Sequence, residues 1–507
     1  MNIQQAKTEL EHTLRVYLQK DEAGRYLFPA VRQRPILLMG PPGVGKTAIM
    51  EQVARENHVA LVAYTMTHHT RQSAVGLPVI EERSYGEERF SVTRYTMSEI
   101  IAEVYAAMER TGLREGILFL DEINCVSETL APTMLQFLQN KTFGNHRLPE
   151  GWLIVAAGNP PEYNKSVRDF DIVTLDRVRR MDITADVEVF LSYGRERGLH
   201  GGILSYLALR PERFYHVSRR ESELCYVTAR GWEDLSRMLL GCEALDIPVT
   251  EELVGEFLHL PETVRDFFAY YSLYEKYGTD YGIPEILSGE AEPGLYGEKC
   301  AMARAGDFTE RFAVVNLVLD RLRTLCRRYG REDSRTVEIH QALKSWFDRQ
   351  EPLEDFLAAR RTALETKKRF GLLGFEELRR QEQVEDRLDG MCLTVKQRHL
   401  FQREQVQEGL RQLFREELDR RSALIADIGN QLERGFRFVE DCFGDGQELT
   451  LLVSGLTASP AVMEFIARHG CECYTRTAGR LLCRLNEPEL QQACRDFLNT
   501  AISKADG

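Results

Sequence analysis

The sequence predicts an α/β core, in which a parallel sheet is covered by helices on both faces, followed by a long helical region. Two observations carry this prediction. Short apolar segments alternate with amphipathic helical patterns through residues 1–190, an order typical of parallel sheets. A glycine-rich turn also joins the first apolar segment to the helix that follows it. We expect four parts: the α/β core (1–190), a helical lid and extension (191–350), a charged helical region (351–435) and a small α/β domain (436–507).

The elements of the core are expected in a regular order. Five apolar segments read as strands of the sheet: residues 35–39, 59–64, 116–122, 152–157 and 180–185. Amphipathic helices alternate with them, over residues 48–57, 97–110 and 130–140. Ligands in such sheets bind beyond the carboxyl ends of the strands. Polar residues that follow the strands are therefore the candidates for a site.

The composition is that of an ordinary globular protein. Of 507 residues, 43% are hydrophobic and 28% are charged, and the formal net charge is −13. This negative balance argues against a general nucleic-acid binder. No apolar run approaches the ~20 residues of a membrane helix, and residues 1–20 lack the core of a signal peptide, so we expect a cytoplasmic protein. The 11 cysteines are scattered and predict reduced thiols rather than disulfides or a metal site.

The most specific motif is the glycine-rich run after the first strand. It fits the phosphate-binding pattern G-x-x-x-x-G-K-[ST] and reads Gly40-Pro41-Pro42-Gly43-Val44-Gly45-Lys46-Thr47. Backbone N–H groups of such a loop surround phosphate oxygens, Lys46 can reach the β- and γ-phosphates, and the Thr47 hydroxyl can bind Mg²⁺. Ala48 continues into a helix whose N-terminus points at the phosphates. The run therefore predicts a nucleotide site with Mg²⁺.

Polar residues follow two later strands of the predicted sheet. Asp121 and Glu122 end the third strand, and Asn159 follows the fourth. Phosphoryl transfer needs a metal near the β- and γ-phosphates and an oriented water. We assign Asp121 to the metal, Glu122 to activation of the water, and Asn159 to hydrogen bonds with the γ-phosphate and the water. Two adjacent acids are usually a solvated turn, but behind a phosphate-binding loop they predict hydrolysis.

These three motifs resemble Walker A, Walker B and sensor 1 of the AAA+ ATPases. Within that group the chain resembles the MoxR-type ATPases, which carry a hairpin inserted in helix 2. Two hairpin patterns support the subgroup. The first covers residues 77–95 and turns at Ser84-Tyr85-Gly86-Glu87, and the second covers residues 141–150 and turns at Gly144-Asn145. The resemblance implies an enzyme that converts ATP to ADP and phosphate with Mg²⁺.

The resemblance also implies two arginines that act on the nucleotide. Arg177 ends a Leu-Asp-Arg segment similar to the one that supplies an arginine finger to a neighbouring subunit, and Arg179 or Arg180 could share that role. Arg230 resembles the sensor 2 arginine, which reaches the γ-phosphate from the helical lid. Ala229 stands where the family usually has proline, a mild departure. Guanidinium groups suit both roles because they stay charged and bind phosphate oxygens bidentately.

The remaining chain predicts helices and then a change of character. Residues 312–329 have the clearest helical pattern, whereas the glycines and prolines of 277–297 predict a loop. Residues 351–432 read as long charged helices with a solvated face. Beyond them we expect a strand at 448–453, a helix at 460–469, extended structure at 473–477 and 479–485, and a closing helix at 487–502. Interaction or assembly is the expected role of this last segment.

The resemblance implies a function as well as a fold. MoxR-type ATPases commonly act as chaperones that remodel or assemble a protein client, often with a partner that bears a von Willebrand A domain. A site shared between subunits implies a homo-hexamer, as a closed ring or an open spiral. Nucleic acid is not an expected partner. Two alternatives stay open: a nucleotide-gated assembly or defence module acting on nucleic acid, and the motor subunit of a metal chelatase, which shares both hairpins.

Overall fold

The computed structural model describes residues 1–68, 76–85, 88–143, 146–163, 170, 172–220, 223–369 and 373–483. Its contacts divide the chain into two compact units. Unit 1 comprises Met1–Leu191 and Leu209–Arg265, and unit 2 comprises Ser192–Ala208 and Asp266–Gly507. Unit 1 contains the predicted α/β core, and the elements described in unit 2 are helices.

Unit 1 is built on a five-stranded parallel sheet with the strand order β2-β5-β8-β1-β9. The strands are β1 (Ile36–Met39), β2 (Ala60–Thr65), β5 (Gly116–Asp121), β8 (Trp152–Gly158) and β9 (Arg179–Asp182). All five fall on the segments that the sequence predicts, so the predicted α/β core is confirmed. In this order β8 lies between β1 and β5, which brings the ends of those three strands together.

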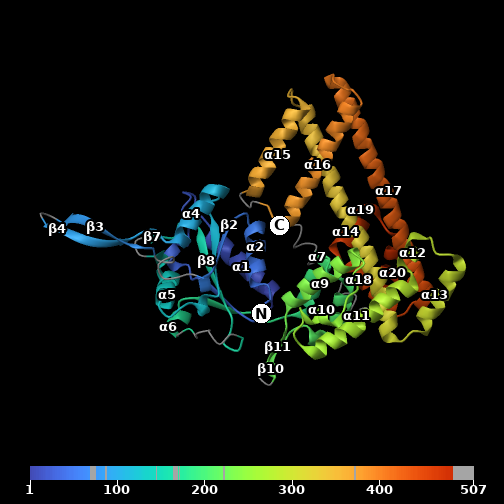
Figure 1. Ribbon diagram of the computed structural model, residues 1–507, viewed down its shortest axis with the longest axis horizontal. Coiled ribbons are helices and arrows are strands. Elements are labelled where there is room, and N and C mark those ends of the chain that lie inside the picture. Colours follow the sequence, from blue (N-terminus) through green and yellow to red (C-terminus); the bar gives the residue numbers. More distant parts are fainter. Residues whose placement is uncertain are drawn as a thin grey trace. The chain divides into compact units, whose positions relative to one another are not determined.

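Helices cover both faces of the sheet. They are α1 (Ile3–Tyr17), α2 (Lys46–Glu56), α4 (Glu99–Thr111) and α5 (Ala131–Asn140). Ile36 and Leu38 of β1 pack with α1 and α2, whereas Leu37 and Met39 pack with α4 and α5. Successive strand residues point to opposite faces, which explains why the whole strand is apolar. Figure 1 shows the sheet between these two helical layers.

Both predicted hairpins are present in unit 1. One pairs β3 (Pro78–Tyr85) with β4 (Glu88–Tyr95), and the shorter one pairs β6 (Thr142–Phe143) with β7 (His146–Arg147). The turn residues Gly86, Glu87, Gly144 and Asn145 lie outside the described residues. The β3–β4 hairpin extends away from the core in Figure 1, and Ile80 is 75% exposed. His146 Nε2 lies 3.2 Å from Tyr95 O, so the base of the β3–β4 hairpin contacts the turn end of the β6–β7 hairpin.

A smaller lid part completes unit 1. It consists of η4 (Pro211–Arg213), β10 (His216–Arg220), β11 (Glu223–Val227), α9 (Ala229–Ala244) and α10 (Glu251–Gly255). The fully buried Trp232 of α9 donates a hydrogen bond from Nε1 to Phe214 O at 3.0 Å. The antiparallel β10–β11 hairpin was not predicted, because we expected only helices in the lid. Short η1 (Ala30–Arg32), η2 (Met66–His68), η3 (Ile123–Cys125) and α6 (Ile172–Leu175) connect elements of the core.

Unit 2 is organised around two long helices, α14 (Phe308–Phe347) and α17 (Arg403–Phe443). Two helices, α7 (Val187–Arg197) and α11 (Pro261–Tyr281), run across the unit boundaries. The other helices of unit 2 are α8 (Gly201–Leu209), α12 (Ile283–Ser288), α13 (Pro293–Ala305), α15 (Leu353–Arg369), α16 (Phe375–Gln397), α18 (Gln447–Thr457), α19 (Pro460–His469) and α20 (Glu472–Cys483). One apolar cluster joins the first half of α14 to the second half of α17, α18 and α19. A second cluster joins the opposite halves to α15 and α16, so the long helices are antiparallel.

Three expectations for unit 2 are wrong. The strand expected at 448–453 is part of α18, because Leu449, Leu452, Val453 and Leu456 line one buried helical face. The extended structure expected at 473–477 and from 479 is helix α20, so the described part of the expected α/β domain, 436–483, is helical. Residues 277–297 are not a loop but parts of α11, α12 and α13, separated at Gly282 and Gly289, which both have positive φ. The closing helix at 487–502 lies outside the described residues, and α17 runs without interruption past the expected boundary at 435.

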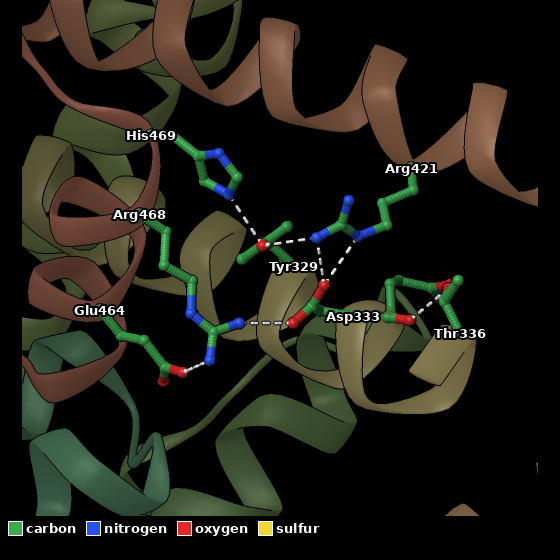
Figure 2. Close-up of polar contacts among 8 residues, drawn as sticks. Tyr329, Asp333, Thr336, Arg421, Glu464, Arg468 and His469 are labelled. Atoms are coloured by element: carbon green, nitrogen blue, oxygen red, sulfur yellow. Dashed lines mark hydrogen bonds and ion pairs between the residues drawn. The ribbon is translucent and has the colours of Figure 1, made fainter. Parts of the chain in front are cut away.

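An ion-pair cluster ties three helices of unit 2 together (Figure 2). The buried Asp333 of α14 accepts hydrogen bonds from Arg421 Nε of α17 at 2.7 Å and from Arg468 Nη1 of α19 at 2.6 Å. One turn earlier, the Tyr329 hydroxyl lies 2.8 Å from His469 Nε2. Burial and the positive charge of Arg421 lower the pKa of His469. The cluster fixes α17 and α19 against the middle of α14.

Candidate active site

The glycine-rich loop lies between β1 and α2, where the sequence predicts it. Gly43 and Gly45 have φ values of 76° and 93°, a region that residues with a side chain rarely adopt. Gly45 caps α2, and Thr47 and Ala48 belong to the first turn of that helix. The N–H groups of a first helical turn have no partner within the helix. The loop therefore has the backbone conformation and the free donors that an anion requires.

Lys46 turns its side chain back onto this loop. Its Nζ donates hydrogen bonds to Gly40 O at 2.8 Å, Pro41 O at 3.0 Å and Asn159 Oδ1 at 2.9 Å. Only 8% of the residue is exposed, and burial lowers the pKa of its amine to about 8, while the charge of Asp121 opposes that shift. A phosphate close to this amine would supply the missing negative charge and raise its pKa. The arrangement fits a nucleotide phosphate.

Thr47 and Asp121 face each other across the start of α2 and the end of β5. The Thr47 hydroxyl donates to Asp121 Oδ2 at 3.1 Å, and the backbone N–H of Glu122 donates to Asp121 Oδ1 at 2.9 Å. Hydroxyl and carboxylate oxygens are ligands that Mg²⁺ accepts, with phosphate oxygens and water as the rest. Among the described residues, no group of three or more His, Cys, Asp or Glu side chains could hold a metal ion. Thr47 and Asp121 could hold Mg²⁺ together with phosphate oxygens of a nucleotide and water.

Glu122 follows Asp121 in a left-handed backbone conformation, with φ of 56°. This conformation is uncommon for residues other than glycine, and such residues often occur at functional sites. The Thr67 hydroxyl, just after β2, donates to Glu122 Oε2 at 3.0 Å. The carboxylate is thus held from the neighbouring strand of the sheet. Its position beside Asp121 suits a group that polarises water.

Asn159 is anchored through both its backbone and its side chain. Its Oδ1 accepts from Lys46, and its carbonyl oxygen accepts from Asn124 Nδ2 at 2.7 Å. Asn124 is only 3% exposed, and its Oδ1 has no hydrogen-bond partner within the described residues. That oxygen lies against Gly158, where a Cβ atom would come within 2.7 Å of it. The segment after β5 and the end of β8 therefore fit together only because residue 158 is glycine.

The lid part of unit 1 contacts the loop at two points. Thr228, the N-cap of α9, lies so close to Gly43 that a Cβ there would be 3.1 Å from Thr228 Cβ and 3.5 Å from Arg230 Cβ. The charge of Arg230 also contributes to the lowered pKa of Lys46. The Tyr215 hydroxyl donates to Pro42 O at 3.0 Å. Arg230 therefore lies close to the phosphate-binding loop. Its role as sensor 2 stays a prediction.

The three candidate finger arginines lie at the opposite edge of the sheet. Arg179 N donates to Pro35 O at 2.8 Å, immediately before β1, so this is the edge where the parallel strands begin. The side chain of Arg179 binds Glu9 and Thr13, and that of Arg180 binds Asp182. Arg177 is exposed and makes no side-chain hydrogen bond or ion pair with any described residue. None of the three is brought to the loop of its own chain.

Sequence reasoning missed three residues of this site: Thr67, Asn124 and Tyr215. Each makes its contact with a residue far away in the chain, which no local pattern reveals. Asn124 carried one signal: it stands two residues after Glu122, where an amide that becomes buried needs a hydrogen-bond partner. Among the described residues, no single helix is long and apolar enough to cross a membrane, although α18 and α19 pass that test together as a pair bent by 87°.

Comparison with known proteins supports an ATPase domain. Residues 36–178 match the family model described as ATPase family associated with various cellular activities (AAA). The matched range contains the glycine-rich loop, Asp121, Glu122, Asn159 and Arg177. A search of curated proteins returned no match.

Proposed function

We propose that this chain, an ATPase by virtue of its AAA domain, hydrolyses ATP at sites shared between neighbouring copies and uses the energy to remodel or assemble a partner protein. AAA domains typically act as oligomers, and a homo-hexamer of the MoxR type is the assembly that we propose. The partner would be a protein client, such as one bearing a von Willebrand A domain.

Within one copy, each site residue has a separate task. Lys46 and the N–H groups of the loop would bind the β- and γ-phosphates, and Arg230 would bind the γ-phosphate from the lid. Thr47 and Asp121 would hold Mg²⁺, which neutralises charge that develops on the phosphate oxygens. Glu122 would take a proton from the attacking water while Asn159 orients it. The hydrogen bonds from Thr67 and Asn124 support these two residues.

The observation that carries the shared site is the position of Arg177. It precedes β9, whereas Asp121 is the last residue of β5, and Lys46 and Asn159 follow the ends of β1 and β8. A four-residue strand such as β1 separates the two edges by about 13 Å at ~3.3 Å per residue. The Arg177 guanidinium has no side-chain partner among the described residues, so it can serve a second copy of the chain more readily than the site of its own chain. Arg179 and Arg180 are less suited because each already binds a carboxylate of its own chain.

The exposed β3–β4 hairpin supports a protein partner rather than nucleic acid. Its two strands contain three arginines and three acidic residues, so they carry no net charge for a phosphate backbone. Ile80, Tyr85 and Phe90 are exposed on it by 75%, 58% and 47%. Exposed apolar side chains of this kind are typical of protein interaction sites. We therefore expect neither DNA nor RNA to stimulate ATP hydrolysis.

The test compares two exposed arginines of the same segment. Arg177→Ala should lower the ATPase rate of the assembled protein by about 10³-fold, as loss of an arginine finger does, and leave ATP binding unchanged. Arg180→Ala is the matched control and should keep the rate within twofold. A wild-type rate for Arg177→Ala in an assembled oligomer would rule out this finger. Glu122→Gln should bind ATP and barely hydrolyse it.

A further inference from the structure

A groove of about 580 Å³ opens on the lid part of unit 1, between β11 and α10. Its floor is apolar and buried, formed by Cys225, Leu258 and Val264. Leu224 lines it with 49% of its surface exposed. Gly255 also lines the groove, and a Cβ added there would meet only Val264 Cγ1 at 4.0 Å. The groove therefore has room for an apolar side chain from another molecule.

One edge of β11 faces this groove with unused backbone groups. Tyr226 exchanges two hydrogen bonds with His259, at 3.1 and 3.0 Å, on the side of β11 away from β10. Hydrogen-bonding sides alternate along an antiparallel strand, so Leu224, two residues earlier, presents its N–H and C=O to that same outer side. No described residue bonds to the Leu224 backbone there. This is an open strand edge of the kind that accepts an added strand.

The surroundings of the groove are acidic. Residues 241–264 contain six acidic residues and no lysine or arginine. Two of the six, Glu251 and Glu252, line the groove from the first turn of α10. Neither carboxylate has a hydrogen-bond or ion-pair partner among the described residues, and both are exposed. A basic group entering the groove would therefore find two carboxylates available to pair with it.

We propose that this groove binds an extended segment of a partner protein, rich in basic and apolar residues, that adds a strand to β11 at Leu224. The backbone of the segment pairs with the Leu224 N–H and C=O. An apolar side chain of the segment fills the space over Cys225 and Val264, and a lysine or arginine pairs with Glu251 or Glu252. The inference takes from the proposed function only that the partner is a protein, and the binding needs no ATP hydrolysis.

Binding is measured on the full chain by fluorescence anisotropy of a labelled short peptide in which lysine and leucine alternate. The same peptide with glutamate in place of lysine should bind at least about tenfold more weakly. Glu251→Lys should weaken binding of the lysine peptide about tenfold. The matched control Glu256→Lys, at the other end of the same helix and outside the groove lining, should change it less than twofold. Equal losses in these two variants would mean non-specific attraction to an acidic surface and would overturn the proposal.

Two further variants test the groove and the strand edge separately. Gly255→Leu places a side chain in the groove, starting from a Cβ that meets only Val264 Cγ1 at 4.0 Å, and should abolish binding. Unchanged affinity would show that the peptide binds elsewhere. Leu224→Pro removes an N–H that the β10–β11 ladder does not use, and should weaken binding about tenfold or more. Full affinity in Leu224→Pro would exclude strand addition. Both variants should keep wild-type ATPase activity, so loss of binding is separable from any failure of the hydrolysis proposal.

Discussion

Replacing Gly158 with alanine should disconnect the acidic segment after β5 from Asn159. The added Cβ would lie 2.7 Å from Asn124 Oδ1, 2.9 Å from its Cγ and 3.1 Å from its Nδ2. All three atoms belong to one buried side chain, which must move and lose its 2.7 Å hydrogen bond to Asn159 O. Overpacking and the lost bond together should lower the free energy of unfolding by about 1–3 kcal/mol.

The effect on hydrolysis should be larger than the effect on binding. A displacement of about 1 Å in a positioned group can cost about 10²-fold in rate, so we expect Gly158→Ala to lower kcat by about 10- to 100-fold. The dissociation constant of ATP should change only a few-fold, because the glycine-rich loop and α2 keep their conformation. Denaturant unfolding, steady-state ATPase rates and titration with a fluorescent nucleotide measure the three quantities.

A double-mutant cycle makes the reasoning refutable. Asn124→Ala removes the atoms that the new Cβ meets. The loss of unfolding free energy in the double variant should therefore be smaller than the sum of the two single losses, by about 1 kcal/mol or more. Its kcat should stay low, because Asn159 has still lost its anchor. Additive stabilities, or a wild-type kcat in Gly158→Ala, would show that the contact between residues 124 and 158 does not position Asn159.

Three other predictions concern single groups. The pKa of Lys46 is about 8 in the folded chain and 10.5 ordinarily. Between pH 8 and 10.5 the unfolded chain therefore binds more protons than the folded chain. The free energy of unfolding should rise over this pH range. ATP affinity of the Glu122→Gln variant should fall as pH rises above 8, because phosphate favours the ammonium form; a pH-independent affinity would contradict the assignment of Lys46. Thr67→Val removes only the hydroxyl that holds Glu122 and should lower kcat about three- to tenfold with unchanged ATP binding, measured by the same two assays. Asp333→Ala should destabilise the protein by about 2–4 kcal/mol in denaturant unfolding. This is less than the loss of a fully buried ion pair, because Arg421 and Arg468 are partly exposed. Glu464→Ala removes only an exposed ion pair and should cost under about 0.5 kcal/mol.

The phosphate-binding loop and the two acids could be predicted because their chemistry is local. A strand, a glycine turn and a helix N-terminus within a short segment define the loop, and Asp121 and Glu122 directly end a buried strand. The order of the strands then places Asn159 next to them. Thr67 and Asn124 could not be predicted, because their hydrogen bonds depend on how different strands align.

The errors in the helical unit have a related cause. Residues 448–453 form an apolar run that suits a buried strand as well as a helix, and only packing against α14 and α17 decides between them. The glycines at 282 and 289 favour a loop by composition, yet Gly282 begins α12 and Gly289 ends it, both in the left-handed conformation. Both cases show that a glycine indicates the end of an element and a short apolar run indicates burial. Neither identifies reliably whether the element is a helix, a strand or a loop.

The most direct test of the central claim, a site completed by a second copy, is to mix two inactive variants. Glu122→Gln lacks the group that activates water, and Arg177→Ala lacks the finger, so each assembly alone should be nearly inactive. In a mixed assembly, Glu122 of one copy can meet Arg177 of the other, and ATPase activity should return to a substantial fraction of the wild-type rate. If assemblies shown to contain both variants stay inactive, the proposal that Arg177 acts on a neighbouring copy is wrong.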